Sequence, residues 1–552
     1  RYARNGSIRQ LALTGNEIQA DVKGSRPRPY KVRISLEKFG PAIQSAILDA
    51  VIENPYFLSQ LLTRRLPPAL FSSFQDKNIP LFPKSWNDID ATCSCPDWAF
   101  CCKHIAAVIY MIANEVDRNP FLLFDIHGMD IFKGLEDRGF SARAHAGIAI
   151  TEPRDLIGRC QAANQPILSP EEREQQLNSL DWSRIPFSRD LLLSLLGSEP
   201  LFYLKKDFKG ILEKALIKTA RHCGRLVRQW EQDEEDSHST PVLFFSDARM
   251  SVNADLEFAG LELYTPDQSF SADGNRTEHH PFRLLFKIPA KEIQSHAHKA
   301  TELSLLVHFA LKLIEQGAIQ PEILYTSTGH RIRWVPALIS PQVQALFNTL
   351  CALATDDLID IPGMPRSEQL KTALSCILGH MIRTGTEGMP EFCEDDIPAM
   401  FFQGRELKVS KAFENREIPQ NIALWLRGFH ISSKDFLPLV RIDETSGGFA
   451  MDVLVEDRKA DLKAPVPIAT ILSNEDYSTV RLDILKDLTL LADYVPAIAD
   501  FLMTGGRNRP EFSAREFETV LFSHLPILRL LRIPVLLPKG MDNLIRPRIG
   551  AR

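Results

Sequence analysis

The sequence lacks long hydrophobic runs and a recognisable leader. None of its apolar stretches reaches the roughly 18 residues that a membrane-spanning helix needs. The first residues also lack the basic, apolar and small-residue regions of a secretory signal peptide. We therefore expect no membrane partner and a cytoplasmic location.

The sequence has little excess charge of either sign. Its 64 lysines and arginines are nearly balanced by 70 aspartates and glutamates, which leaves a formal net charge of −6. Overall charge therefore does not predict a polyanion partner, and any surface that binds nucleic acid must be a local one.

Several catalytic motifs are missing. The sequence contains no GxxxxGK[ST] phosphate-binding loop. It has no GxSxG nucleophile elbow and no dinucleotide-binding fingerprint, and no Ser/His/Asp set stands out. The chain by itself is therefore not expected to hydrolyse ATP, and a hydrolase function has little support.

Cysteine is scarce except at one place. The chain has nine cysteines, and five of them are far apart, unlike the disulfide framework of a small secreted domain. The other four fall within CSCPDWAFCCKH, which begins at Cys93 and ends at His104. In a reducing compartment such a cluster favours metal ligands over disulfides.

The spacing within this cluster predicts a zinc site. Cys93 and Cys95 are two residues apart, so in an extended segment both side chains point to one face. Cys102 and His104 form a second pair directly before IAAVIYMIANEV, whose apolar residues recur at helical spacing. A hairpin and a helix start would then supply three thiolates and one imidazole, a closed tetrahedral shell typical of structural Zn²⁺. We expect these four residues to hold one zinc ion per chain, with Trp98 covering the site.

Alternatives remain open from the residues alone. The cysteines could be ordinary buried thiols, or Cys101 and Cys102 could be joined by oxidation. Cys101 could also replace Cys102 as the third sulfur ligand, although Cys102 keeps the CxH pairing.

The segment CSCPDWAFCCKHIAAV resembles the SWIM zinc finger, whose pattern is CxC, a variable gap and CxH. It is most similar to the version found in bacterial Swi/Snf-type DNA-dependent ATPases, with Cys101 where we would expect proline. The resemblance extends upstream through RYARNGSIRQLALTGNEIQADVKGSRPRPYKVRISL and downstream through DRNPFLLFDIHG. Later phrases, such as HPFRLLFKIP, HRIRWVPAL and RLDILKDLTLLADYVPAIADFL, resemble the helicase-associated region of those ATPases. The resemblance implies that ATPase motor lobes follow in cis if the natural chain continues past Arg552.

Hydrophobic patterning predicts an α+β fold, with a small N-terminal antiparallel sheet, a zinc-binding hairpin–helix module and a larger mixed α/β region. Alternation predicts strands for SIRQLAL, EIQADVK and YKVRISL. From about residue 241, helical patterns such as KATELSLLVHFALKLIEQ alternate with strand-like runs, namely TPVLFF, HPFRLLFKIPA, EILYTS, HRIRWVPAL and FAMDVLVED. We expect a SWIM module over residues 1–125, a mainly helical connecting region over 126–238 and a helicase-associated α+β region, of one or two lobes, over 239–552.

Two local basic surfaces are candidates for nucleic-acid contact. The loop GSRPRPY places Arg26 and Arg28 beside Tyr30. The segment KKDFKGILEKALIKTARHCGRLVRQW predicts an amphipathic helix with a row of cations at four-three spacing: Lys214, Lys218, Arg221, Arg225 and Arg228. Either surface could instead be a solvated face, and the helix could pair with acids elsewhere.

Together these features predict the zinc-binding, DNA-engaging accessory region of a bacterial Swi/Snf-type ATP-dependent DNA translocase, which would bind DNA without sequence preference. The alternative is a zinc-stabilised platform for protein partners that makes no direct contact with nucleic acid.

Overall fold

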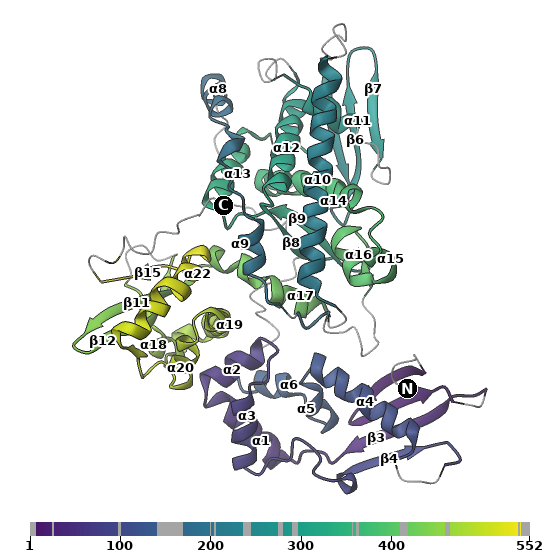
Figure 1. The fold of residues 1–552 in the computed structure, drawn as a ribbon, viewed down its shortest axis with the longest axis vertical. Helices are drawn as coiled ribbons and strands as arrows, with labels where there is room; N and C mark the ends of the chain where they lie inside the picture. Colours follow the sequence, from purple (N-terminus) through teal and green to yellow (C-terminus); the bar gives the residue numbers. More distant parts are fainter. Residues whose placement is uncertain are drawn as a thin grey trace. The chain divides into compact units, whose positions relative to one another are not determined.

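The structure is a computed structural model. It describes residues 7–24, 27–97, 101–140, 169–198, 200–203, 206–235, 244–273, 280–289, 296–355, 357–359, 361, 364–408, 418–458, 464–538 and 541. The chain divides into two compact units (Figure 1). The first combines Arg1–Ala149 with Ser410–Arg552, and the second is Ile150–Val409. None of the helices in the described ranges is long and apolar enough to cross a membrane.

The N-terminal part of the first unit contains an antiparallel sheet in the order β1-β2-β3-β4. The strands are β1 (Ile8–Thr14), β2 (Glu17–Val22), β3 (Tyr30–Leu36) and β4 (Ile89–Cys93). The first three are the strands that alternation predicts, and β4 joins them from the segment before the cysteine cluster. One face of the sheet is buried under α4 (Lys103–Arg118), where Val22, Val32 and Val108 share a core. This core fixes the end of β4 beside the start of α4.

A second layer of helices lies between β3 and β4 in sequence. These helices are α1 (Pro41–Ile52), α2 (Pro55–Leu62) and α3 (Pro68–Asp76), and after α4 come α5 (Leu122–Ile126) and α6 (Ile131–Glu136). Helix α2 is buried from Phe57 to Leu62. It packs against α1 and also against two helices of the C-terminal segment, α19 (Ser478–Tyr494) and α20 (Ala497–Met503). The first and last parts of the chain therefore share one hydrophobic core.

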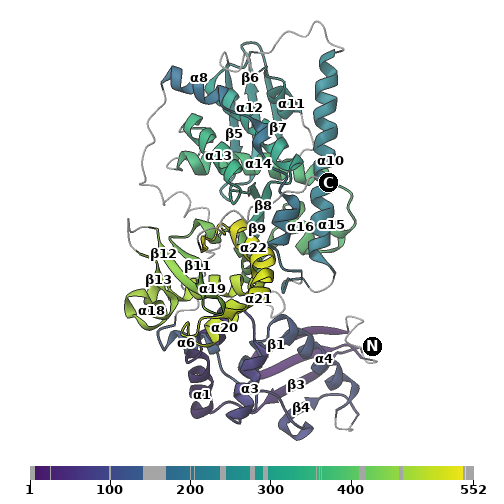
Figure 2. The ribbon, with the colours of Figure 1, turned by 60° about the vertical axis from the view of Figure 1, so that its left-hand side comes forward.

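The C-terminal part of the first unit is built on a second sheet (Figure 2). The strand order is β13-β12-β11-β15, with β11 and β12 as a long antiparallel pair, and β14 also pairs with β12. The strands are β11 (Phe436–Thr445), β12 (Gly448–Asp457), β13 (Val466–Pro467), β14 (Glu511–Phe512) and β15 (Val535–Leu536). The other helices are α17 (Ile418–Leu426), α18 (Ile468–Ser473), α21 (Ala514–Thr519) and α22 (Leu525–Leu530). Inside this part, buried Asp487 accepts hydrogen bonds from Lys434 Nζ at 2.6 and 2.7 Å.

The second unit places two three-stranded sheets among long helices. One sheet has the order β5-β6-β7, with strands Asp247–Val252, Phe258–Tyr264 and Ser269–Asp273. The other has the order β10-β9-β8, with strands Leu407–Lys408, Gly329–Pro336 and Ile319–Tyr325. The helices are α8 (Pro170–Asn178), α9 (Arg189–Ser194), α10 (Phe208–Glu235), α11 (His280–Phe286), α12 (His298–Glu315), α13 (Pro341–Leu353), α14 (Arg366–Thr386), α15 (Glu391–Glu394) and α16 (Asp396–Phe402). Helix α14 packs on α10, α12 and β9, which places it at the centre of the unit.

The predicted α+β class, with its small N-terminal sheet, is confirmed. One strand prediction in the second unit was wrong. HPFRLLFKIPA forms α11, because Phe282 and Leu285, three residues apart, are both fully buried on one helix face. In TPVLFF, Phe244 and Phe245 precede β5, and the rest of that run lies outside the described residues. The division at residues 125 and 238 stays a prediction.

A buried carboxyl in the second unit gives its stability a pH dependence. Glu302 on α12 is 3% exposed and accepts hydrogen bonds from the backbone N–H and hydroxyl of Thr355 at 3.0 and 3.1 Å. Burial raises the pKa of Glu302 to about 7, although the Thr355 hydrogen bonds and Arg173 oppose this shift. Because the folded state holds this proton more tightly than the unfolded state, stability is fully present below about pH 4.5 and is lost as the pH rises through about 7.

We expect the unfolding free energy of the second unit to fall by roughly 3 kcal/mol between about pH 4.5 and pH 8 through this group. Glu302→Gln, which cannot ionise, should remove that part of the decline. Urea unfolding of both proteins at several pH values measures the difference. Parallel pH profiles for the two proteins would contradict the assignment.

Candidate functional site

The first two cysteines of the cluster are positioned by sheet pairing. Cys93 is the last residue of β4 and lies opposite Val32 in β3. Ser94 extends the pairing, because its N–H donates to the Lys31 carbonyl at 3.0 Å and its hydroxyl accepts from the Lys31 N–H at 2.9 Å. Cys95 follows at once, so the CxC segment is held against the edge of β3.

The second pair is positioned by the start of α4. Cys102 is the N-cap residue, and its carbonyl accepts the first helical hydrogen bond, from the Ala106 N–H at 3.0 Å. His104 follows in the first turn. Cys101 before them has φ +60°, a left-handed conformation that turns the chain into the helix.

These four side chains converge. One ligand atom from each of Cys93, Cys95, Cys102 and His104 can be chosen so that all four lie within 4.8 Å of one another. His104 presents Nδ1, which is 3.9 Å from both Cys93 Sγ and Cys102 Sγ. Ligand atoms around a tetrahedral zinc ion are about 3.5–3.8 Å apart, as follows from metal–ligand bonds of about 2.0–2.3 Å. The donor set and its spacing therefore fit one zinc ion, with slight closure of the cage on binding.

The surroundings favour the metal-binding form of Cys102 and His104 and disfavour that of Cys93. Burial raises the pKa of the Cys93 thiol to about 12. Burial alone would also raise the pKa of Cys102, but the backbone amides of Ile105 and His104 at the start of α4, with the neighbouring thiols, hold it below its ordinary value. Burial lowers the pKa of His104. The imidazole is therefore neutral at physiological pH and can offer a nitrogen lone pair to a metal.

The histidine ring is oriented by residues that sequence reasoning did not assign to the site. The Tyr30 ring lies 4.6 Å from the His104 ring, centroid to centroid, at an interplanar angle of 39°. A Cβ atom on Gly24 would lie 2.3 Å from the Tyr30 ring and 3.3 Å from His104 Nε2, so only glycine fits there. The sequence gives little indication of this arrangement, because it shows only one glycine after the second strand and one tyrosine at the start of the third.

The structure distinguishes Cys101 from Cys102. Cys102 belongs to the group of four ligands and Cys101 does not. Cys101 and Cys102 are both free thiols, so they do not form a disulfide. Trp98, the predicted cover of the site, lies outside the described residues.

The structure describes only part of the first predicted basic surface but all five cations of the second. Arg26 lies outside the described residues, and Arg28 is exposed in the loop between β2 and β3. On α10, Lys218 is half-buried and donates to the Glu387 carbonyl at 2.7 Å, whereas the other four cations, Lys214, Arg221, Arg225 and Arg228, are exposed. None of these five α10 cations forms an ion pair with an acidic residue in the described ranges. The predicted row is therefore present, and its charges are not neutralised by described acids.

Comparisons with known proteins cover parts of the chain. Residues 77–113 match the SWIM zinc finger family, and residues 185–411 match a domain of unknown function (DUF8276). The uncharacterized protein Rv2102 of Mycobacterium tuberculosis strain H37Rv is 33% identical over 129 residues, which make up 23% of this chain and 47% of that protein. The chain thus spans about half the length of the curated relative it matches. No solved structure matches the chain. From the motif, the ligand geometry and these matches, the chain contains a SWIM zinc finger with a Cys₃His zinc site and, after it, a DUF8276 domain.

Proposed function

We propose that the chain is a zinc-binding accessory region that engages DNA, and that it acts with a Swi/Snf-type ATPase motor. The motor partnership is the implication of the SWIM resemblance. The proposal of DNA binding depends mainly on the row of exposed cations along α10 (Lys214, Arg221, Arg225 and Arg228), which lack acidic partners among the described residues.

The geometry of α10 suits a nucleic-acid backbone. From Lys214 to Arg228 the helix rises by about 21 Å, and the row stays within an arc of about 80° around the axis. A row of this length can follow several phosphates along one strand. The helix is held firmly, because the opposite face, with Leu212, Cys223 and Trp230, is buried. The cations are therefore carried on a rigid support.

We expect the triple variant Arg221→Gln, Arg225→Gln, Arg228→Gln to bind duplex DNA at least about tenfold more weakly at low salt. The slope of log affinity against log salt should also decrease by about three, because three phosphate contacts are lost. Fluorescence anisotropy with labelled duplexes of two unrelated sequences measures affinity, salt dependence and sequence preference together.

The matched control removes three positive charges that already have acidic partners. Lys299 pairs with Asp357 at 2.9 Å, Lys312 with Glu315 at 2.7 Å and Arg405 with Asp396 at 2.7 Å. Changing these three residues to Gln alters the net charge by the same amount as the α10 triple variant does. It should leave most of the affinity for duplex DNA intact. If both triple variants lose affinity alike, or if the intact protein does not bind DNA, the proposed interface is wrong.

A protein-interaction platform remains the second candidate, and one observation favours it. Three large aromatic side chains in or next to the zinc finger are half-exposed: Phe82, Trp86 and Tyr110, each at 49%. Aromatic side chains of this kind are common anchors in protein interfaces. If Trp86→Ala with Tyr110→Ala weakens binding to isolated motor lobes while DNA affinity stays unchanged, the finger docks protein rather than DNA.

A further inference from the structure

A cavity of about 340 Å³ lies in the second unit, and its lining includes no residue of the zinc site or of the row on α10. Its walls come from the start of β6, the middle of β9, the second half of α14 and the end of α16. The volume lies within the range of small-molecule binding sites, which is about 300–1,000 Å³. Nothing in the zinc-finger or DNA-binding role uses this space.

Three arginines and one glutamate line the cavity. Arg331 and Arg333 project from β9 and are only 8% and 4% exposed, and Arg383 comes from the last turns of α14. Glu257 lies 3.1 Å from Arg331 Nη1. Phe258, Phe401 and Phe402 add apolar surface to the walls. The lining thus combines concentrated positive charge with aromatic surface.

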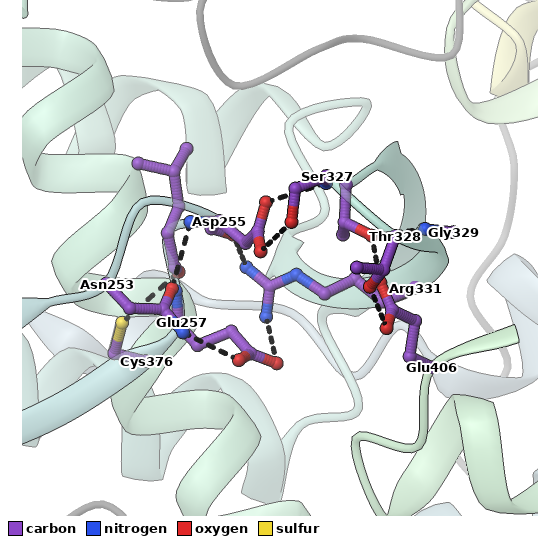
Figure 3. A network of polar contacts seen from close by, with 11 residues as sticks. Asn253, Asp255, Glu257, Ser327, Thr328, Gly329, Arg331, Cys376 and Glu406 are labelled. Carbon is purple, nitrogen blue, oxygen red and sulfur yellow. Dashed lines mark hydrogen bonds and ion pairs between the residues drawn. The ribbon is translucent and has the colours of Figure 1, made fainter. Parts of the chain in front are cut away.

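The nearby acceptors take hydrogen bonds from only some of the donor nitrogens of Arg331 and Arg333. Figure 3 shows Arg331 between Glu257 and the backbone carbonyl of Asp255, to which its Nη2 donates. The Asp255 carboxylate is engaged by Ser327, whose N–H and hydroxyl donate to it at 3.0 Å each. Arg333 Nε donates to Glu322 at 2.6 Å.

Three of the guanidinium nitrogens lie beneath the accessible surface, with no hydrogen bond among the described residues. Arg331 Nε and both Nη atoms of Arg333 are buried and make no hydrogen bond within the described residues. Arg333 Nη2 forms an ion pair with Glu368 Oε2 at 3.7 Å, which is too long for a hydrogen bond. Buried donors without acceptors cost about 1–3 kcal/mol each, and more when charged, so native proteins normally supply a partner. Because arginine carries donors only, any group that pairs with these side chains must bring acceptor atoms.

We propose that this cavity binds a small molecule bearing an oxyanion, a phosphate or a carboxylate, which Arg331, Arg333 and Arg383 recognise. The oxyanion pairs with the guanidinium groups where they reach the cavity wall, and the aromatic wall takes the organic part of the ligand. Two lining donors are already used and would not compete, since Trp334 Nε1 donates to the Phe401 carbonyl at 2.7 Å and Gln403 Nε2 to Thr386 Oγ1 at 2.9 Å. Phosphate and carboxylate are the groups that guanidinium binds in a bidentate manner.

Gly379 allows the cavity to be filled without disturbing the arginines. It lies on α14, lines the cavity and is half-buried, and a Cβ atom placed on it would meet nothing within 4 Å. Gly224 on α10 is a matched control, because it is also helical and half-buried, and its added Cβ would likewise meet nothing within 4 Å. Replacing either glycine by leucine also removes a residue that disfavours helix.

The test uses the full zinc-loaded chain with three probes, inorganic phosphate, ribose 5-phosphate and citrate, against potassium chloride at equal ionic strength. Isothermal titration calorimetry should detect binding of at least one probe to the wild type and to Gly224→Leu. Binding should be at least about tenfold weaker in Gly379→Leu. Tighter binding of ribose 5-phosphate than of inorganic phosphate identifies an organic phosphate as the source, and preference for citrate identifies a carboxylate.

Two results would overturn the proposal: no binding of any probe, or equal binding by Gly379→Leu and the wild type. If Gly379→Leu does not fold, as judged by circular dichroism, Arg383→Gln replaces it. Arg383 is half-buried, so this change should keep the fold while weakening binding at least about tenfold. Unchanged affinity in that variant would also reject the site.

Discussion

Cys102→Ser is expected to release zinc and unfold the sheet and helix around the finger, whereas Cys101→Ser should retain one zinc ion per chain. Cys102 belongs to the ligand group, and its thiol is the one whose pKa the start of α4 lowers. Cys101, its neighbour in sequence, is outside that group. Closing a four-ligand zinc site contributes about 10 kcal/mol or more to folding, so loss of one sulfur removes the largest single stabilising contact of this region.

Zinc content by elemental analysis, and amide hydrogen exchange of residues 80–118, should be measured together on both variants. The wild type treated with a strong chelator should behave like Cys102→Ser. Retention of zinc by Cys102→Ser, or equal loss from both serine variants, would show that the ligand assignment is wrong.

The second large effect is expected from isolating residues 1–149 from residues 410–552. Four apolar side chains of α2, Phe57, Leu58, Leu61 and Leu62, are buried where this helix meets α1, α19 and α20. Exposing one such side chain to water removes about 1.5–3 kcal/mol of folding free energy. The truncated chain also loses the ion pair between Arg65 and Asp493, at 2.5 Å. We expect residues 1–149 alone to bind zinc but to be less stable by several kcal/mol. The apolar face of α2 should then be exposed to solvent.

Fragment 1–149 can be tested by chemical unfolding and by dye binding to exposed apolar surface. Adding fragment 410–552 in trans should restore the stability, because the two segments share a core. Leu61→Asp in fragment 1–149 is the control, since it should abolish that rescue while zinc stays bound. A fragment 1–149 that is as stable alone as with its partner would contradict this account.

The local part of the site could be predicted because zinc coordination depends on short sequence spacing. The CxC pair is placed by the geometry of one strand, and the CxH pair by the geometry of one helix turn. Four residues within twelve positions were therefore enough to predict the zinc ligands. The arrangement of Gly24 and Tyr30 against His104 depends on the turn between β2 and β3, which no spacing rule specifies. The CxH pairing already favoured Cys102 over Cys101, and the left-handed backbone at Cys101 is the part that spacing did not predict.

The fold was predictable where one face of an element is buried. Strands β1 to β3 alternate clearly for that reason, whereas α11 is too short for its period to be read against a strand. Arg331 and Arg333 illustrate a different limit. Their alternation in HRIRWVPAL suggests a solvent-facing side of a strand, yet every residue of β9 is buried because α14 and α16 cover it. A cavity built from four segments far apart in sequence leaves no local pattern.

The pairing of the first and last segments in one unit has a consequence for synthesis on the ribosome. The α2 surface emerges early, but the helices that cover it, α19 and α20, are translated more than 400 residues later. At about 5–20 residues per second, this face stays uncovered for tens of seconds while the intervening unit is made. Nascent chains should therefore depend on chaperones during that interval, even when zinc has already organised the finger.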